Sequence, residues 1–299
     1  MTSTSAREVV EQAGSSVERG AQETRRRAEN GTGWYAWLAR AGLVAAGVSY
    51  ALVGVLAIGV AVDAGGSTTS REGALDSLAR QPFGEVVLVL LAIGFAAYAL
   101  WRLVQAIFER KDPSDGEEKA IAKKWGKRAS YLGRTVIYGA LAVATVRILF
   151  GTHGSSQNQD ARQTTATLLE WPAGTWIVLA IGLFITGVGL WNLYRGASKK
   201  FEEKWRTGEM SRRARAWASP VGVVGHLARG VVFALVGAFV VKAALEYDPK
   251  EAIGLDGALQ KLAQADHGPW LLGATAAGLL AYGVFCFVDA RYRDVSAGP

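Results

Sequence analysis

Long apolar windows restrict most strongly how this chain can fold. Six windows of the 299-residue sequence are almost free of Asp, Glu, Lys and Arg: 38–62, 86–101, 135–146, 173–191, 230–241 and 269–288. The longest exceed the roughly 18 residues that mark a membrane span. The mean hydropathy of +0.16 is also unusual for soluble domains. The sequence therefore predicts an all-α integral membrane protein with six transmembrane helices.

Lysine and arginine concentrate on one side of these predicted spans. The two ends of the chain and the loops on the same side hold 22 of them, against 5 in the alternate loops. The positive-inside rule then predicts that both termini are cytoplasmic. The basic side is expected to contact anionic lipid headgroups, at about 1 kcal/mol per nearby basic residue. The N-terminal arm balances five Arg with five Glu, so no nucleic-acid partner is expected.

The spans also contain a threefold internal repeat. The odd-numbered spans align without gaps as Ala46-Gly47-Val48-Ser49-Tyr50-Ala51-Leu52, Arg134-Thr135-Val136-Ile137-Tyr138-Gly139-Ala140 and Arg229-Gly230-Val231-Val232-Phe233-Ala234-Leu235. Matching turns at Gly84, Gly174 and Gly268 precede the even-numbered spans, each after a stretch expected to form a short helix. The repeat predicts three parallel helical hairpins around a pseudo-threefold axis along the membrane normal.

This repeat sets the expected organisation of the chain. The parts are a polar cytoplasmic arm at 1–33, disordered or loosely helical; repeat one at 34–110 with spans 1 and 2; repeat two at 111–200 with spans 3 and 4; repeat three at 201–292 with spans 5 and 6; and a tail at 293–299. Both ends of each hairpin are expected on the cytoplasmic side.

The repeated motifs resemble those of a known family. The Arg-Gly-Val-Val-Phe/Tyr-Ala-Leu-Val-Gly element, with Ala-Leu-x-x-Leu-Ala and Gly-Phe-Ala-Ala-Tyr-Ala-Leu-Trp, is similar to the bacterial domain of unknown function 1206. The resemblance implies three copies of a two-helix membrane unit in a bacterial plasma membrane, and it supplies no catalytic residue. Repeat two departs from the pattern, with Val188 where the other repeats have Tyr98 and Tyr282.

Basic residues recur at equivalent positions inside spans three and five. Arg134 matches Arg229, and Arg147 matches Lys242. If equivalent faces converge on an axis, Arg134 and Arg229, with His226 one turn earlier, form a site for an anion or a lipid phosphate. The alternative interpretation is snorkelling, because the 13 residues between the members of each pair correspond to about 20 Å of helix and leave every charge near an interface.

Two further sets of residues are expected to have structural roles. The expected interfacial anchors are Arg147, Lys242, Trp37, Trp101, Trp125, Trp191 and Trp217. Small residues four apart are expected to pack the odd-numbered helices closely: Gly47 with Ala51, Thr135 with Gly139, and Gly230 with Ala234. Glycines that line a narrow pore would produce the same pattern.

Catalytic, metal and cofactor chemistry has little support in the sequence. The single cysteine, Cys286, lies in an apolar window, and the three histidines are far apart, so no disulfide and no metal site are expected. Phosphate-binding glycine loops and hydrolase motifs are missing, so we expect neither a cofactor nor an enzyme. The favoured interpretation is a membrane scaffold or accessory subunit with an unidentified membrane-protein partner. The alternative is a transporter or pore for a small solute, anion or lipid that uses the repeat-equivalent arginines.

Overall fold

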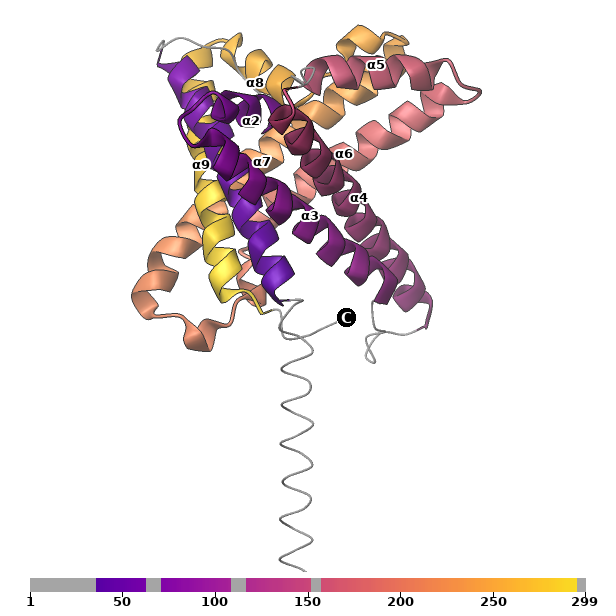
Figure 1. The fold of residues 1–299 in the computed structure, drawn as a ribbon. Coiled ribbons are helices and arrows are strands. Elements are labelled where there is room, and N and C mark those ends of the chain that lie inside the picture. The colour runs from indigo at the N-terminus through magenta and orange to yellow at the C-terminus, as the bar shows by residue number, and fades with distance from the viewer. Residues whose placement is uncertain (1–35, 63–70, 109–116, 152–156, 295–299) are drawn as a thin grey trace, which may run out of the picture.

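The computed structural model describes residues 36–62, 71–108, 117–151 and 157–294, so the predicted arm at 1–33 lies outside the described residues. Six helices within these ranges are long and apolar enough to cross a membrane. They are Ala36–Ala61, α3 (Gly84–Phe108), α4 (Glu117–Leu149), α6 (Gly174–Ala197), α7 (Arg212–Glu246) and α9 (Gly268–Tyr292) (Figure 1). The prediction of an all-helical protein with six apolar spans is confirmed.

One short helix precedes each even-numbered span, as the repeat predicts. These helices are α2 (Arg71–Ala79), α5 (Gln157–Leu169) and α8 (Leu255–Ala263). All three lie at the same end of the bundle, which we call the short-helix end (Figure 1). The opposite end, where α9 finishes, is called the terminal end.

The turn between each short helix and its span requires glycine. Phe83, Ala173 and His267 adopt positive φ, and the next residue in each case is the glycine that begins the span. A Cβ atom on Gly174 would lie 2.0 Å from the carbonyl oxygen of Leu168, and the same clash occurs at Gly84 and Gly268. Any larger residue must therefore displace backbone at this turn.

Small residues bring each odd-numbered span against the even-numbered span of the preceding repeat. A Cβ atom on Gly189 of α6 would lie 2.5 Å from the Ala234 backbone of α7, and Gly230 lies against Leu193 in the same interface. Thr135 of α4 faces α3, where its hydroxyl lies 3.5 Å from the Ala99 carbonyl oxygen. The first helix completes the series, because Gly47 and Ala51 contact Gly283 of α9.

These contacts give the partners of the small residues, which the sequence left open. They pack odd-numbered helices against even-numbered ones, and they correct the expectation at one position. Gly139 makes no such contact, since no described residue lies within 4 Å of its added Cβ atom.

Repeat two is more open than repeats one and three. In the other two repeats a glycine on the odd-numbered span lies directly against a tyrosine on the even-numbered span: Gly42 against Tyr98, and Gly225 against Tyr282. At the equivalent positions repeat two carries Ser130 and Val188. Among the described helices, α4 and α6 make at most marginal contact with each other. The sequence departure at Val188 therefore coincides with a missing helix–helix interface.

The loop at 198–211 folds back onto the terminal end of the bundle. Its Phe201, Trp205 and Met210 side chains are buried. The Arg206 N–H donates to the Tyr292 carbonyl oxygen at 2.8 Å, and the Asp294 N–H donates to the Lys204 carbonyl oxygen at 2.9 Å. These bonds fasten the loop to the end of α9.

The turn geometry predicts how alanine substitutions affect stability. Gly174→Ala should lower the free energy of unfolding by about 1–3 kcal/mol, because the added methyl group forces backbone to move. Gly187→Ala, on the same helix with open space around it, should be neutral or stabilising by up to about 1 kcal/mol. Thermal unfolding of both variants in detergent checks this, and an equal loss of stability at the two positions would contradict it.

Candidate functional site

A small cavity of about 50 Å³ inside the bundle collects most of the buried charge, and we call it the arginine cavity. The charged side chains that line it are Arg102 of α3, Arg134 of α4, Arg195 of α6, Arg229 of α7, and Asp289 and Arg293 at the end of α9. Five guanidinium groups thus face one carboxylate. The cavity has room for a few water molecules or one small anionic group.

Arg229 is held by aromatic side chains from three helices. Its guanidinium group donates to the Tyr282 hydroxyl. The same group lies 5.4 Å from the Tyr50 ring centre and 5.1 Å from the Phe233 ring centre. Aromatic faces attract cations, so these rings offset part of the cost of burial. The Nε atom of Arg229 is buried and has no hydrogen-bond partner in the described part of the chain.

Arg102 has a comparable setting in repeat one. It is only 2% exposed, and it donates to the Tyr98 hydroxyl and to Oε1 of Gln105, both at 2.7 Å. Its guanidinium group also lies 4.0 Å from the Trp101 ring centre. Tyr98 and Tyr282 occupy equivalent positions in their repeats, and each accepts a hydrogen bond from an arginine of the cavity. The tyrosine missing from repeat two is therefore an arginine ligand as well as a packing residue.

The carboxylate of Asp289 is already occupied by neighbouring groups. One oxygen lies 2.6 Å from a guanidinium nitrogen of Arg293, and the other accepts from Nε1 of Trp205 at 3.2 Å. Charge-assisted bonds of this length are strong. Asp289 therefore neutralises Arg293 and fixes Trp205 of the 198–211 loop, which leaves four arginines without a carboxylate from the cavity lining.

Arg134 and Arg195 are the arginines that the protein holds least. Neither forms a hydrogen bond or an ion pair with any residue in the described ranges. Both are partly buried and line the arginine cavity. Their guanidinium groups are thus the donors most available to a bound anion.

Lys204 adds to the positive field at the terminal end. It lies in the 198–211 loop, outside the spans, and part of its side chain is exposed. Desolvation of its ammonium group, followed by repulsion from Arg293, Arg195, Arg102 and Arg134, lowers the pKa of Lys204 to about 7. The charge of Lys204 therefore changes near neutral pH.

The three residues predicted to form an anion or lipid site all line this cavity: Arg134, Arg229 and His226. His226 is 1% exposed, its Nδ1 donates to the Gly222 carbonyl oxygen at 2.8 Å, and its ring stacks on Phe201. It lies well inside α7, because the helix begins at Arg212. These contacts make His226 an aromatic packing residue in the lining of the cavity.

Sequence reasoning missed Arg102, Arg195 and Arg293. They lie near the ends of even-numbered spans, where basic residues are ordinarily taken as interfacial. The repeat register gives no common signal for them, because Arg102 directly follows Trp101, Arg195 lies one turn after Trp191, and Arg293 lies eight residues after Phe285.

The expected anchors divide into buried and exposed residues. Trp101 is 2% exposed, so the prediction that it is an interfacial anchor is wrong; its indole packs on the Arg102 guanidinium group instead of facing lipid. Lys242 forms ion pairs with Glu251 at 2.9 Å and with Glu246 at 3.7 Å. The remaining exposed side chains are those of Trp37, Trp191, Trp217 and Arg147. The side chain of Trp125 lies outside the described residues.

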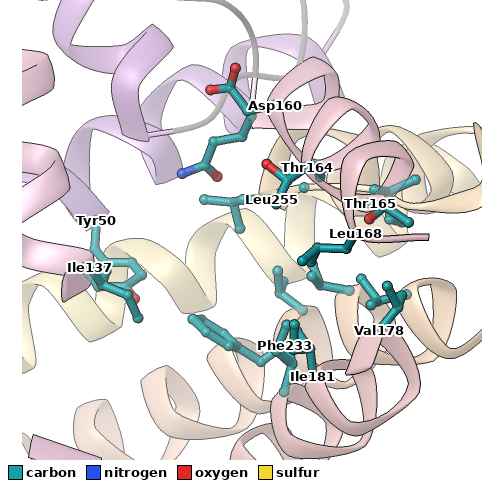
Figure 2. Close-up of a pocket in the computed structure, with 18 residues that line it drawn as sticks. Tyr50, Ile137, Asp160, Thr164, Thr165, Leu168, Val178, Ile181, Phe233 and Leu255 are labelled. Atoms are coloured by element: carbon teal, nitrogen blue, oxygen red, sulfur yellow. The ribbon is translucent and has the colours of Figure 1, made fainter. Parts of the chain in front are cut away.

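A larger, apolar cavity of about 380 Å³ adjoins the first, and we call it the apolar cavity. Its lining comes from α5, α6 and α7, with Ile137 of α4, Tyr50 and Leu255 of α8 (Figure 2). Ile137 and Phe233 line both cavities. No cluster of His, Cys, Asp and Glu suited to a metal ion occurs among the described residues.

The fold and the site define a helical membrane protein built from three repeats around a buried arginine cluster. The chain belongs to the family called Domain of Unknown Function (DUF1206), whose profile matches residues 41–109, 129–199 and 224–293. It is 28% identical over 263 residues to the uncharacterized protein YxxB of Bacillus subtilis (strain 168), which covers 88% of this chain and 93% of that protein. No solved structure matches the chain.

The charge balance of the arginine cavity predicts the effect of removing its carboxylate. Asp289→Asn should lower the free energy of unfolding by about 3–5 kcal/mol, because Arg293 loses its partner while it stays buried. Thermal unfolding in detergent measures this, with Asp266→Asn on an exposed turn as the matched control. A loss no larger than that of the control would show that Asp289 is not needed to balance the cavity.

Proposed function

We propose that this protein recognises a phosphate-type anion in the arginine cavity. The observation that carries the proposal is the convergence of five arginines, four from helices and Arg293 from the residue after α9, with one carboxylate, on a single buried space. Arginine presents several N–H donors in a fixed plane, which suits the oxygens of a phosphate. Charged residues inside membrane segments ordinarily mark a ligand or ion pathway.

The cost of the cavity without a ligand supports the same conclusion. Each buried guanidinium group gives up solvation worth several kcal/mol, and like charges in a low-dielectric space repel one another. Tyrosine hydroxyls and aromatic rings compensate Arg102 and Arg229, whereas Arg134 and Arg195 receive nothing comparable from the described residues. A bound anion would supply the missing negative charge to these two side chains.

The proposal also includes an orientation. We place the terminal end in the cytoplasm, as the 22-to-5 distribution of basic residues predicts, with the three repeats related by a pseudo-threefold axis along the membrane normal. The contact of the first helix with α9 supports a closed series of repeats. The arginine cavity would then lie on the cytoplasmic side of a bacterial plasma membrane.

A membrane scaffold or accessory subunit is the second candidate function. The close contacts at Gly47, Gly189 and Gly283 support it, because they make rigid interfaces that change little with a ligand. This role needs a stoichiometric membrane-protein partner and no occupant of the arginine cavity. A transporter or pore needs the cavity to exchange its ligand, so anion binding is the measurement that separates these roles.

Substitution of the two least-held arginines tests anion recognition. Purified protein in detergent should bind inorganic phosphate or glycerol 3-phosphate in calorimetric titrations. Arg134→Gln and Arg195→Gln should each weaken binding by about tenfold or more, because each removes a charged hydrogen bond of about 1.5–3 kcal/mol.

Arg147→Gln is the matched control, because Arg147 is an exposed span residue that does not line the cavity. It should bind the same ligands as tightly as the unmodified protein. Equal affinities for all three variants, or no binding by the unmodified protein, would overturn the proposal. A partner that copurifies in constant ratio under the second outcome would favour the scaffold.

The pKa of Lys204 predicts a pH dependence for this binding. Glycerophosphoglycerol, a phosphodiester of constant charge, should bind about threefold less tightly at pH 8.5 than at pH 6, because Lys204 loses its positive charge above about 7. Lys204→Met should remove the dependence and bind weakly at both values. If the Lys204→Met variant kept the full pH dependence, a group other than Lys204 would be its cause.

A further inference from the structure

We propose that the occupant is a membrane lipid, with its phosphate in the arginine cavity and an acyl chain in the apolar cavity. This inference rests on the proposed anion recognition and adds the class of ligand. Three observations carry it: the two cavities share lining residues, the apolar cavity is lined by exposed residues of α4 and α6, and the charged and apolar parts lie in the order found in a lipid.

The wall between the cavities is formed by shared side chains. Ile137 and Phe233 line both spaces. Tyr50, which lines the apolar cavity, and Phe233 both lie over the guanidinium group of Arg229. A molecule with its phosphate beside Arg229 is therefore in contact with side chains that also line the apolar cavity. A free phosphate would leave this second space unfilled.

The apolar cavity faces the surface where repeat two is open. Ile137 on α4 is 42% exposed and Ile181 on α6 is 39% exposed, and both line the cavity. These two helices make at most marginal contact in the described part of the chain, and nothing lies within 4 Å of the added Cβ atom of Gly139. The surrounding phase at this surface is lipid, so an acyl chain can move between α4 and α6 from the bilayer.

The lining of the apolar cavity suits a hydrocarbon chain. Six of its 18 lining residues are branched aliphatic side chains from α6 and α7, at Val178, Ile181, Ile185, Val232, Val236 and Val240. Its volume of about 380 Å³ lies within the range of small-molecule sites. The polar residues Asp160 and Thr164 of α5 lie at its other boundary, near the short-helix end (Figure 2).

The two cavities are also arranged along the bundle in the same order as the headgroup and acyl chains of one bilayer leaflet. The arginines lie toward the terminal end, and the apolar cavity extends from Phe233 to Val240 along α7, about 10 Å toward the short-helix end. A lipid of the leaflet at the terminal end has its phosphate and chain in the same order. Such a lipid can therefore bind without changing its orientation in the membrane. Its second acyl chain would stay in the bilayer, outside the gap between α4 and α6.

Matched lipid and headgroup probes test this inference. Detergent-solubilised protein is titrated with dioleoylphosphatidylglycerol and with glycerophosphoglycerol, the same headgroup without chains, and binding is followed by native mass spectrometry and calorimetry. The lipid should bind about 100-fold more tightly or better, because burial of several methylene groups adds to the phosphate contacts. Dioleoylglycerol, which lacks the phosphate, should not bind.

Substitutions that fill the apolar cavity should separate the contributions of the acyl chain and the headgroup to the binding affinity. Ile181→Trp occupies the opening at a partly exposed position, so the fold can accept it, and Ile185→Phe fills the interior as a second variant. Each should weaken lipid binding at least tenfold and leave the affinity for glycerophosphoglycerol unchanged. Leu183→Trp, an exposed residue of α6 that does not line the cavity, should change neither.

The possible failures are distinguishable. Equal affinities for lipid and headgroup, or no effect of Ile181→Trp and Ile185→Phe on a tightly bound lipid, would overturn the lipid inference and leave anion recognition intact. Binding of dioleoylglycerol as tight as that of the phospholipid, or binding of neither phosphate probe, would overturn the proposed function itself. Unchanged headgroup binding in the two variants also shows that they are folded.

Discussion

Close approach of helix backbones is the constraint on which the rest of this structure depends. In lipid, helices gain little from burial of apolar side chains, so association relies on van der Waals contact and on hydrogen bonds between spans. Glycine and alanine supply that contact at the interface of the first helix with α9 and at that of α6 with α7. These interfaces fix the directions from which side chains reach the interior. The arginines converge because rigid seams hold the helices that carry them.

Divergence among the repeats turns this arrangement into a site. Repeats one and three keep the glycine–tyrosine contact that closes each hairpin, and the tyrosine hydroxyls at 98 and 282 accept from Arg102 and Arg229. Repeat two carries Val188 at that position, and its two spans make at most marginal contact in the described part of the chain. Ser130 and Val188 thus replace the glycine–tyrosine contact of the other two repeats, and Val188 also lacks the hydroxyl that accepts from an arginine there.

Much of this architecture was predictable from the sequence, because its signals are local or periodic. Apolar windows gave the six spans, the repeat gave the short helices α2, α5 and α8, and glycines marked the turns into α3, α6 and α9. The partners of the small residues were not predictable, since one face of a helix can meet any neighbour. The prediction for Trp101 was wrong for a related reason. A tryptophan near the end of a span looks the same in the sequence whether its indole faces lipid or a buried guanidinium group.

Only part of the candidate site could be predicted from the sequence, because the sequence does not show which charged side chains lose solvent. Arg134 and Arg229 stand out because they interrupt apolar windows at equivalent positions, whereas Arg102, Arg195 and Arg293 follow their windows and resemble ordinary flanking charges. Depth in the bundle, rather than distance from the end of a window, decides which charges lose solvent. The 198–211 loop packs on the terminal end of the bundle, where Trp205 contacts Phe285 of α9 and donates to Asp289. Asp289 is bonded to Arg293 and to this loop, and the four cavity arginines without a bonded carboxylate are the reason for proposing an anionic ligand.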